Sequence, residues 1–125
     1  MTVLLDSDII IEILRRRDDL VLAQWSELAA SDVQVLTSPV SVAEIEAGAR
    51  PSEMGAIQQF FSLIECSPID ESVGRRAGEL MRRYSRSHGV EIADALIAAT
   101  AIHRQAALWT RNRKHYPMPE LVVYG

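Results

Sequence analysis

Apolar residues along the chain follow two patterns: short uninterrupted runs, and longer stretches in which they recur every three or four positions. The runs at residues 2–5, 33–36 and 107–109 predict buried strands. The longer stretches predict amphipathic helices, because this spacing places apolar side chains on one helix face. Helices are expected from Ser7 to near Arg15, from Asp18 to about Ala30, from Ser38 to Gly48, from Ser52 to Glu65, from Asp70 to His88 and from Glu91 to Gln105.

Strands that alternate with helices predict an α/β fold with a mainly parallel sheet of four to five strands, covered by helices on both faces. Ser67–Ile69 and Leu121–Tyr124 are interpreted as two further short strands, and residues 110–115 as a turn or short helix. Ligands of such folds bind beyond the carboxyl ends of the strands. Asp6 and residues 110–112 follow strands and are therefore expected at that edge.

The helices differ in how much of their surface is apolar. The stretch from Glu91 to Gln105 is apolar almost all round and predicts a central buried helix. In the helix that begins at Asp18, Leu20, Trp25 and Leu28 are expected to face the core.

Composition narrows the class of protein. A chain of 125 residues with 48% hydrophobic and 24% charged residues fits one globular domain, residues 1–125. The longest apolar run, Ala95–Ala101, is too short to span a membrane, and no secretory signal is visible. A single cysteine excludes an internal disulfide and suits a reducing compartment, so a cytoplasmic location is expected. The net charge of −4 argues against a broad basic face for nucleic acid.

Two acids accompany the first predicted strand. Asp6 directly follows it, and Ser7 is available to cap the next helix, which leaves Asp6 buried without that role. Asp8 in the first helical turn is favoured by the helix dipole, and a supporting role at a metal is an equal alternative. An isolated carboxylate among apolar residues is costly unless something compensates its charge. A divalent cation would do so, because such cations prefer oxygen ligands.

Two more acids lie in helices. Ser41 and Glu44 match a capping box, but Ser38 followed by proline is a better start signal, which would place Glu44 inside the helix. Asp94 lies near the start of the most apolar helix, where a metal-facing position is favoured over a surface position stabilised by the helix dipole. Glu91, three residues earlier, lies on the same side and could support it.

Polar and basic residues follow the strand at 107–109. Thr110 and Asn112 could bind a water, a metal or a phosphate, although both residues are also common in turns. Arg111 and His115 belong to a small basic cluster with Arg113 and Lys114. Such a cluster is either a solvated face or a clamp for phosphate.

Taken together, three segments resemble the PIN domain, and within it the VapC-type ribonuclease toxins of prokaryotic toxin–antitoxin pairs. These segments are VLLDSDIIIEIL, SPVSVAEIEAGA, and EIADALIAATAI followed by ALWTRNRKHY. The resemblance implies a three-layer α/β/α fold in which Asp6, Glu44 and Asp94 hold Mg²⁺ or Mn²⁺ for RNA hydrolysis. It also implies a homodimer, a neutralising antitoxin and a heterotetramer or larger assembly with it. Asn112 stands where the family often has a fourth acid, and an uncharged amide binds a second cation poorly.

Two other classes share the early acidic residues. A haloacid-dehalogenase-like phosphatase also has Asp-x-Asp after its first strand, but it needs a later lysine and a paired acidic motif. The only lysine here is Lys114, and Glu120 is the only acid after it. A receiver-type signalling domain needs a phospho-acceptor aspartate after a central strand, and residues 40–65 contain no aspartate.

Overall fold

The structure is a computed structural model that describes residues 1–125. Parallel strands and helices alternate along the chain, as the apolar pattern predicts. The strands are β1 (Thr2–Leu5), β2 (Gln34–Thr37), β3 (Glu65–Cys66) and β4 (Ala107–Trp109). The α-helices are α1 (Ser7–Arg15), α2 (Asp19–Ala29), α3 (Pro39–Ala47), α4 (Met54–Ser62), α5 (Glu71–His88) and α6 (Ile92–His103). The structure also contains two 3₁₀ turns, η1 (Pro51–Glu53) and η2 (Arg113–His115).

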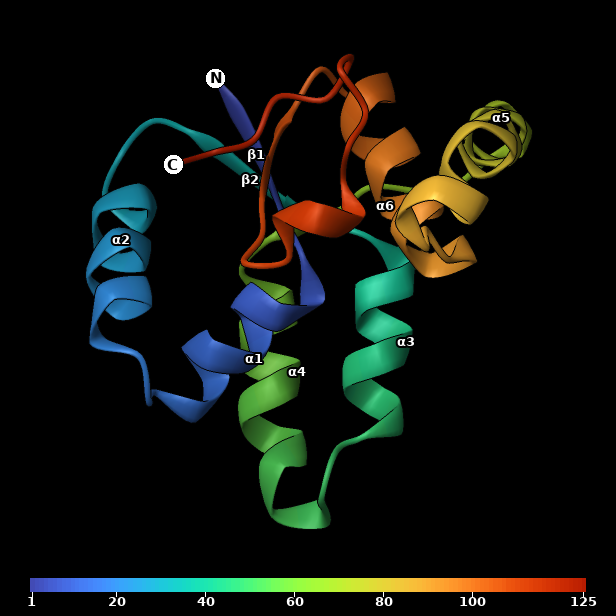
Figure 1. Cartoon of the computed structure of the whole chain (residues 1–125). Coiled ribbons are helices and arrows are strands. Elements are labelled where there is room, and N and C mark those ends of the chain that lie inside the picture. The colour runs from blue at the N-terminus through green and yellow to red at the C-terminus, as the bar shows by residue number, and fades with distance from the viewer.

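The four strands form one parallel sheet in the order β3-β2-β1-β4. Val3 of β1 pairs with Val35 on one side and Ala107 on the other, so β1 is a central strand. Hydrophobic clusters cover both faces, because successive side chains of a strand point to opposite sides. Leu4 packs with α5 and α6, whereas Val3 and Leu5 pack with α1 to α4. The predicted three-layer α/β/α arrangement is confirmed (Figure 1).

Two predicted strands are wrong in detail. The third strand is Glu65–Cys66 and not Ser67–Ile69, because Pro68 has no N–H to donate to a sheet ladder. The predicted strand at Leu121–Tyr124 is reduced to a single parallel bridge between Leu108 and Val123. The helix predicted to Glu65 ends at Ser62, which makes room for β3.

The inward face of α2 also differs from the prediction. Leu20 is 79% exposed, whereas Val21 and Leu28 are buried. The reason is the helix start: the Asp18 carboxylate accepts hydrogen bonds from the backbone N–H groups of Leu20 and Val21. This cap begins the helix at Asp19 and sets a phase that turns Val21 inward. The prediction that α6 is buried is confirmed, since Ile97 and its neighbours Ala98 to Ala101 are almost fully buried.

The parallel arrangement brings three strand ends to one edge of the sheet. The residues that follow β1, β2 and β4 are Asp6, Ser38 and Thr110, all of them buried polar residues. Polar side chains are therefore gathered where ligands of such folds bind. No helix of the structure is both long and apolar enough to cross a membrane.

Candidate active site

Asp6 is the central acid of this edge and is 7% exposed. Its Oδ1 accepts a hydrogen bond from the Ser7 backbone N–H at 2.8 Å, and Asp6 is the N-cap of α1. The prediction that Ser7 caps this helix is therefore wrong. Asp6 has the extended backbone conformation that a cap requires, whereas Ser7 is already helical.

Two hydroxyl groups donate to the other oxygen of Asp6. Thr110 Oγ1 lies 2.7 Å from Oδ2, and the Tyr116 hydroxyl lies 3.1 Å from it. Burial raises the pKa of the Asp6 carboxyl; its hydrogen bonds oppose this effect, and the negative charge of Asp94 adds to it. The structure thus brings Asp6 and Asp94 close enough to interact electrostatically.

Asp8 is the second acid at this edge. Burial, followed by the charge of Asp6, raises the pKa of its carboxyl from 3.8 to about 6. Its Oδ2 accepts the Arg111 backbone N–H at 3.0 Å, but its buried Oδ1 has no hydrogen-bond partner. Asp8 therefore contributes to the acidic site and is more than an exposed first-turn residue.

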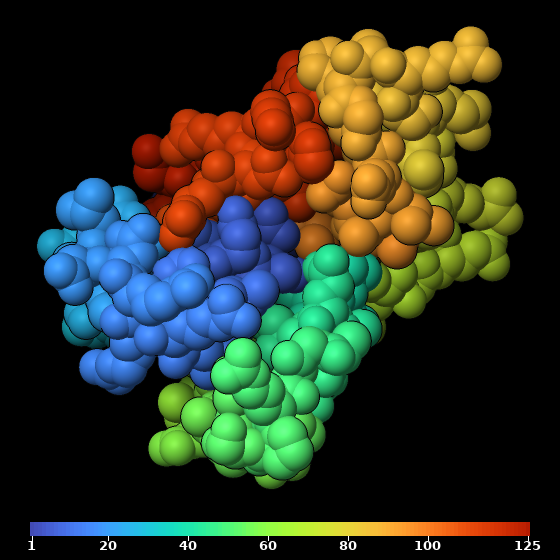
Figure 2. Space-filling view, turned by 60° about the horizontal axis from the view of Figure 1, so that its bottom comes forward, coloured from blue at the N-terminus to red at the C-terminus, as the bar shows by residue number.

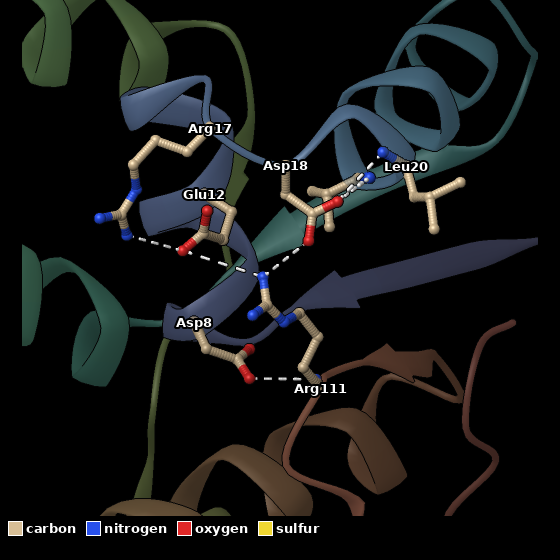
Figure 3. A network of polar contacts seen from close by, with 7 residues as sticks. Asp8, Glu12, Arg17, Asp18, Leu20 and Arg111 are labelled. Atoms are coloured by element: carbon tan, nitrogen blue, oxygen red, sulfur yellow. Dashed lines mark hydrogen bonds and ion pairs between the residues drawn. The ribbon is translucent and has the colours of Figure 1, made fainter.

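Arg111 connects this acid to the turn between α1 and α2 (Figure 3). Its Nη1 lies 3.1 Å from Asp18 Oδ2 and 3.8 Å from Glu12 Oε1. Glu12 is also paired with Arg17 at 3.0 Å. The positive charge of Arg111 is thus balanced by two carboxylates, and its side chain braces the loop after β4 against the α1–α2 turn.

Asp94 lies in the first turn of α6, and its side chain is 17% exposed. Its Oδ2 accepts the Glu91 backbone N–H at 3.1 Å, so Asp94 stabilises the helix start as well as contributing charge. Glu91 is the N-cap residue and is exposed. The His115 ring nitrogen Nδ1 lies 3.5 Å from Asp94 Oδ2.

Glu44 is placed differently from the two aspartates. Ser38 caps α3 by accepting the Ser41 N–H, so the capping-box interpretation of Glu44 is wrong. Glu44 lies inside the helix and its Oε1 accepts a 2.6 Å hydrogen bond from the Ser7 hydroxyl. No three acidic, histidine or cysteine side chains are gathered at the spacing of metal ligands. Glu44 is thus hydrogen-bonded to Ser7, the residue after Asp6, and makes no hydrogen bond with Asp6 itself.

Asn112 and His115 form a second link between the loop and the acids. The Asn112 backbone N–H donates to Thr110 Oγ1 at 3.0 Å, and its side-chain Nδ2 lies 2.8 Å from His115 Nδ1. Asn112 therefore orients Thr110 and His115, and its side chain is turned toward the histidine.

Sequence reasoning missed Tyr116, which donates directly to Asp6. The available signal was a tyrosine in an apolar stretch shortly after a strand, since a buried tyrosine hydroxyl usually needs a partner. That the partner lies 110 residues earlier could not be inferred from the sequence.

The side chains at this edge suit a hard divalent cation by their chemistry, and no three of them lie at the spacing of metal ligands. Asp6, Asp8 and Asp94 supply carboxylate oxygens, and Mg²⁺ and Mn²⁺ prefer oxygen ligands. The orphaned Oδ1 of Asp8 and the mutual repulsion of these acids are what a bound cation would relieve. In Figure 2 the blue start of the chain lies beside the orange start of α6 and the red-orange loop after β4. Asp6 and Asp8 belong to the first of these segments and Asp94 to the second.

A parallel three-layer α/β fold with carboxylates at the carboxyl edge defines a class of proteins suited to metal-assisted chemistry. The chain belongs to the PIN domain family, which it matches over residues 3–121. The predicted family membership is confirmed.

Named relatives agree with this assignment. Ribonuclease VapC10 of Mycobacterium tuberculosis is 39% identical over 120 residues, covering 94% of this chain and 88% of that protein. Ribonuclease VapC19 of the same organism is 41% identical over 98 residues, covering 77% and 78%. Among solved structures, FitAcB from Neisseria gonorrhoeae has a TM-score of 0.77 at 27% identity, covering 98% and 96%. VapBC2 from Rickettsia felis, bound to a promoter DNA fragment, has a TM-score of 0.83 at 23% identity, covering 99% and 98%, which is a likeness of fold.

Proposed function

We propose that this chain is a VapC-type toxin, an endoribonuclease that hydrolyses RNA phosphodiester bonds and is neutralised by a cognate antitoxin. The observation that carries the proposal is the pair Asp6 and Asp94. These acids come from distant parts of the chain and lie at the carboxyl edge of a PIN fold, where the negative charge of Asp94 helps to raise the pKa of the Asp6 carboxyl. The relatives that match along most of the chain are named as ribonucleases.

We infer that Asp6, Asp94 and Glu44 would hold the metal, Mg²⁺ or Mn²⁺. A bound cation of this kind polarises a phosphate and lowers the pKa of an attacking water. Asp8 would add negative charge nearby. The Ser7 hydroxyl donates to Glu44, and Ser7 directly follows Asp6 in the chain, so this hydrogen bond keeps Glu44 near the other two acids.

The other residues of the site have orienting roles in this proposal. Thr110 holds Asp6, and the Glu91 backbone N–H holds Asp94. His115, held by Asn112, is the residue best placed to contact substrate beside Asp94. Arg111 is bound to two carboxylates, so its contribution is to fix the loop, and a phosphate would have to displace Asp18 to reach it.

The partner we propose is an antitoxin. Solved structures of the same fold include VapBC2 from Rickettsia felis and a toxin–antitoxin complex from Klebsiella pneumoniae. We propose that this chain forms a homodimer that assembles with its antitoxin into a heterotetramer or larger complex. We expect it to act in the cytoplasm, where the exposed Cys66 would remain reduced.

RNA cleavage by the purified chain, free of any antitoxin, tests the activity. Single-stranded RNA should be cleaved with Mg²⁺ or Mn²⁺, EDTA should stop cleavage, and added Mg²⁺ should restore it. Asp94→Asn should remove activity, whereas Asp19→Asn, an exposed first-turn aspartate of α2, should not. Full cleavage in EDTA would overturn the metal mechanism, and a wild-type chain without cleavage would overturn the function.

Neither alternative class is favoured by an observation. A receiver-type domain would become labelled by a small phosphoryl donor, and a phosphatase would release phosphate from a monoester. We expect neither result from a PIN domain.

A further inference from the structure

Tyr116 reaches the central acid from the opposite end of the chain. Its hydroxyl donates to Asp6 Oδ2 at 3.1 Å, and the two residues are 5% and 7% exposed. The ring packs in the core cluster that contains Met118 and Leu121. A ring fixed in a core has little freedom, so the hydroxyl is delivered to one place with little entropy left to lose.

The hydrogen bonds of Asp6 leave it little free capacity. An ionised carboxylate has about four lone-pair sites. The Ser7 N–H uses one on Oδ1, and the hydroxyls of Thr110 and Tyr116 use two on Oδ2. One site therefore remains, and it is on Oδ1.

The direction of these bonds is set by the surroundings. Thr110 Oγ1 accepts the Asn112 N–H, so its own proton is directed to Asp6. The Tyr116 hydroxyl has no other partner, and in a buried site its proton is directed to Asp6 as well. Both hydroxyls stabilise the charged form of the acid, and together they prevent Oδ2 from rotating away.

We propose that Tyr116 is a positioning residue for the metal centre: it locks Asp6 so that a single lone pair of Oδ1 is available to a cation. The inference rests on the proposed function, in which Asp6 holds a divalent cation. Partners that orient a metal ligand typically change metal affinity by about 10- to 100-fold when they are removed. Loss of the Tyr116 hydroxyl should act through Asp6 and leave RNA binding elsewhere unaffected.

The test is Tyr116→Phe, which keeps the ring and removes only the donor. Calorimetry with Mn²⁺ in the absence of RNA should show affinity about tenfold weaker than wild type. With Mn²⁺ held at a subsaturating level, kcat should fall while KM for RNA stays unchanged. Tyr124→Phe is the matched control, because that ring packs against Trp109 with a centroid distance of 5.6 Å and its hydroxyl forms no hydrogen bond. It should match wild type in both measurements.

A second variant isolates the donated proton. Incorporation of 4-aminophenylalanine at position 116 keeps a weaker N–H donor at the same place, so Mn²⁺ affinity should lie between wild type and Tyr116→Phe. If Tyr116→Phe does not fold, the Mn²⁺ affinity of this variant is compared with that of wild type directly, and it should be weaker. A wild-type chain that binds no Mn²⁺ would overturn the proposed function and this inference with it. Normal Mn²⁺ binding by wild type together with unchanged affinity in the Tyr116 variants would overturn the inference alone.

Discussion

Asp8→Asn should make the metal-free protein more stable at neutral pH. The charged Asp8 carboxylate is half-buried beside Asp6, and its Oδ1 has no partner. Asparagine keeps an oxygen for the Arg111 N–H and removes the charge. Most substitutions destabilise a protein, so an increase in stability is a demanding prediction.

The magnitude follows from the pKa of Asp8. The carboxyl pKa rises from 3.8 to about 6 in the folded state. One pKa unit corresponds to about 1.4 kcal/mol, which gives an upper limit of about 3 kcal/mol. Asp8 is partly exposed, so solvent screening reduces the expected gain to about 1–2 kcal/mol. For a chain of this size that is a rise in Tm of roughly 4–8 °C.

Because the pKa shift of Asp8 is upward, it determines how stability changes with pH. The folded state binds the Asp8 proton more tightly than the unfolded state, so folding is favoured while Asp8 is protonated. This stability is fully present below the unfolded pKa of 3.8 and is lost as pH rises to about 6. Asp8→Asn should remove that loss. The difference in free energy of unfolding between the variant and wild type should therefore grow as pH rises from 3.8 to about 6.

Urea unfolding in EDTA, repeated across this pH window and at neutral pH, measures the effect. Asp19→Asn is the matched control, since Asp19 is also a first-turn aspartate but is exposed. Its free energy of unfolding should stay close to wild type. A wild-type level of stability in Asp8→Asn at neutral pH, or an unchanged pH dependence, would refute the electrostatic account.

Three further substitutions separate roles at the site. Asp6→Asn should abolish RNA cleavage and, unlike Asp8→Asn, should lower Tm, because an amide cannot accept from both Ser7 and the two hydroxyls; a normal cleavage rate would exclude Asp6 as a ligand. Glu44→Gln should lose most activity and Mg²⁺ affinity with little change in Tm, since Gln can still accept from Ser7; retained Mg²⁺ affinity would make Glu44 structural. Asn112→Asp should tighten binding of a second Mn²⁺ in calorimetry, because it adds a negative charge at the turn after β4; unchanged stoichiometry and affinity would place Asn112 outside the metal site.

Local patterns predicted the fold, because strand runs, helix periods and chain order are properties of short segments. They failed where one backbone angle or one distant partner decides the outcome. Whether Asp6 or Ser7 caps α1 depends on which residue is extended. The partners of Arg111 and Tyr116 lie about a hundred residues away and exist only after the sheet has formed. The roles of Asp6, Glu44 and Asp94 at a metal remain predictions.

The separation between Asp6 and its two hydroxyl donors has a consequence for biosynthesis. Thr110 and Tyr116 follow Asp6 by 104 and 110 residues. A nascent chain on the ribosome therefore carries its first acid long before either donor has been made. Until β4 docks beside β1, that acid lacks the contacts that orient it. Under the proposed function, the site is therefore completed only late in translation, once Tyr116 has been made and β4 has docked beside β1.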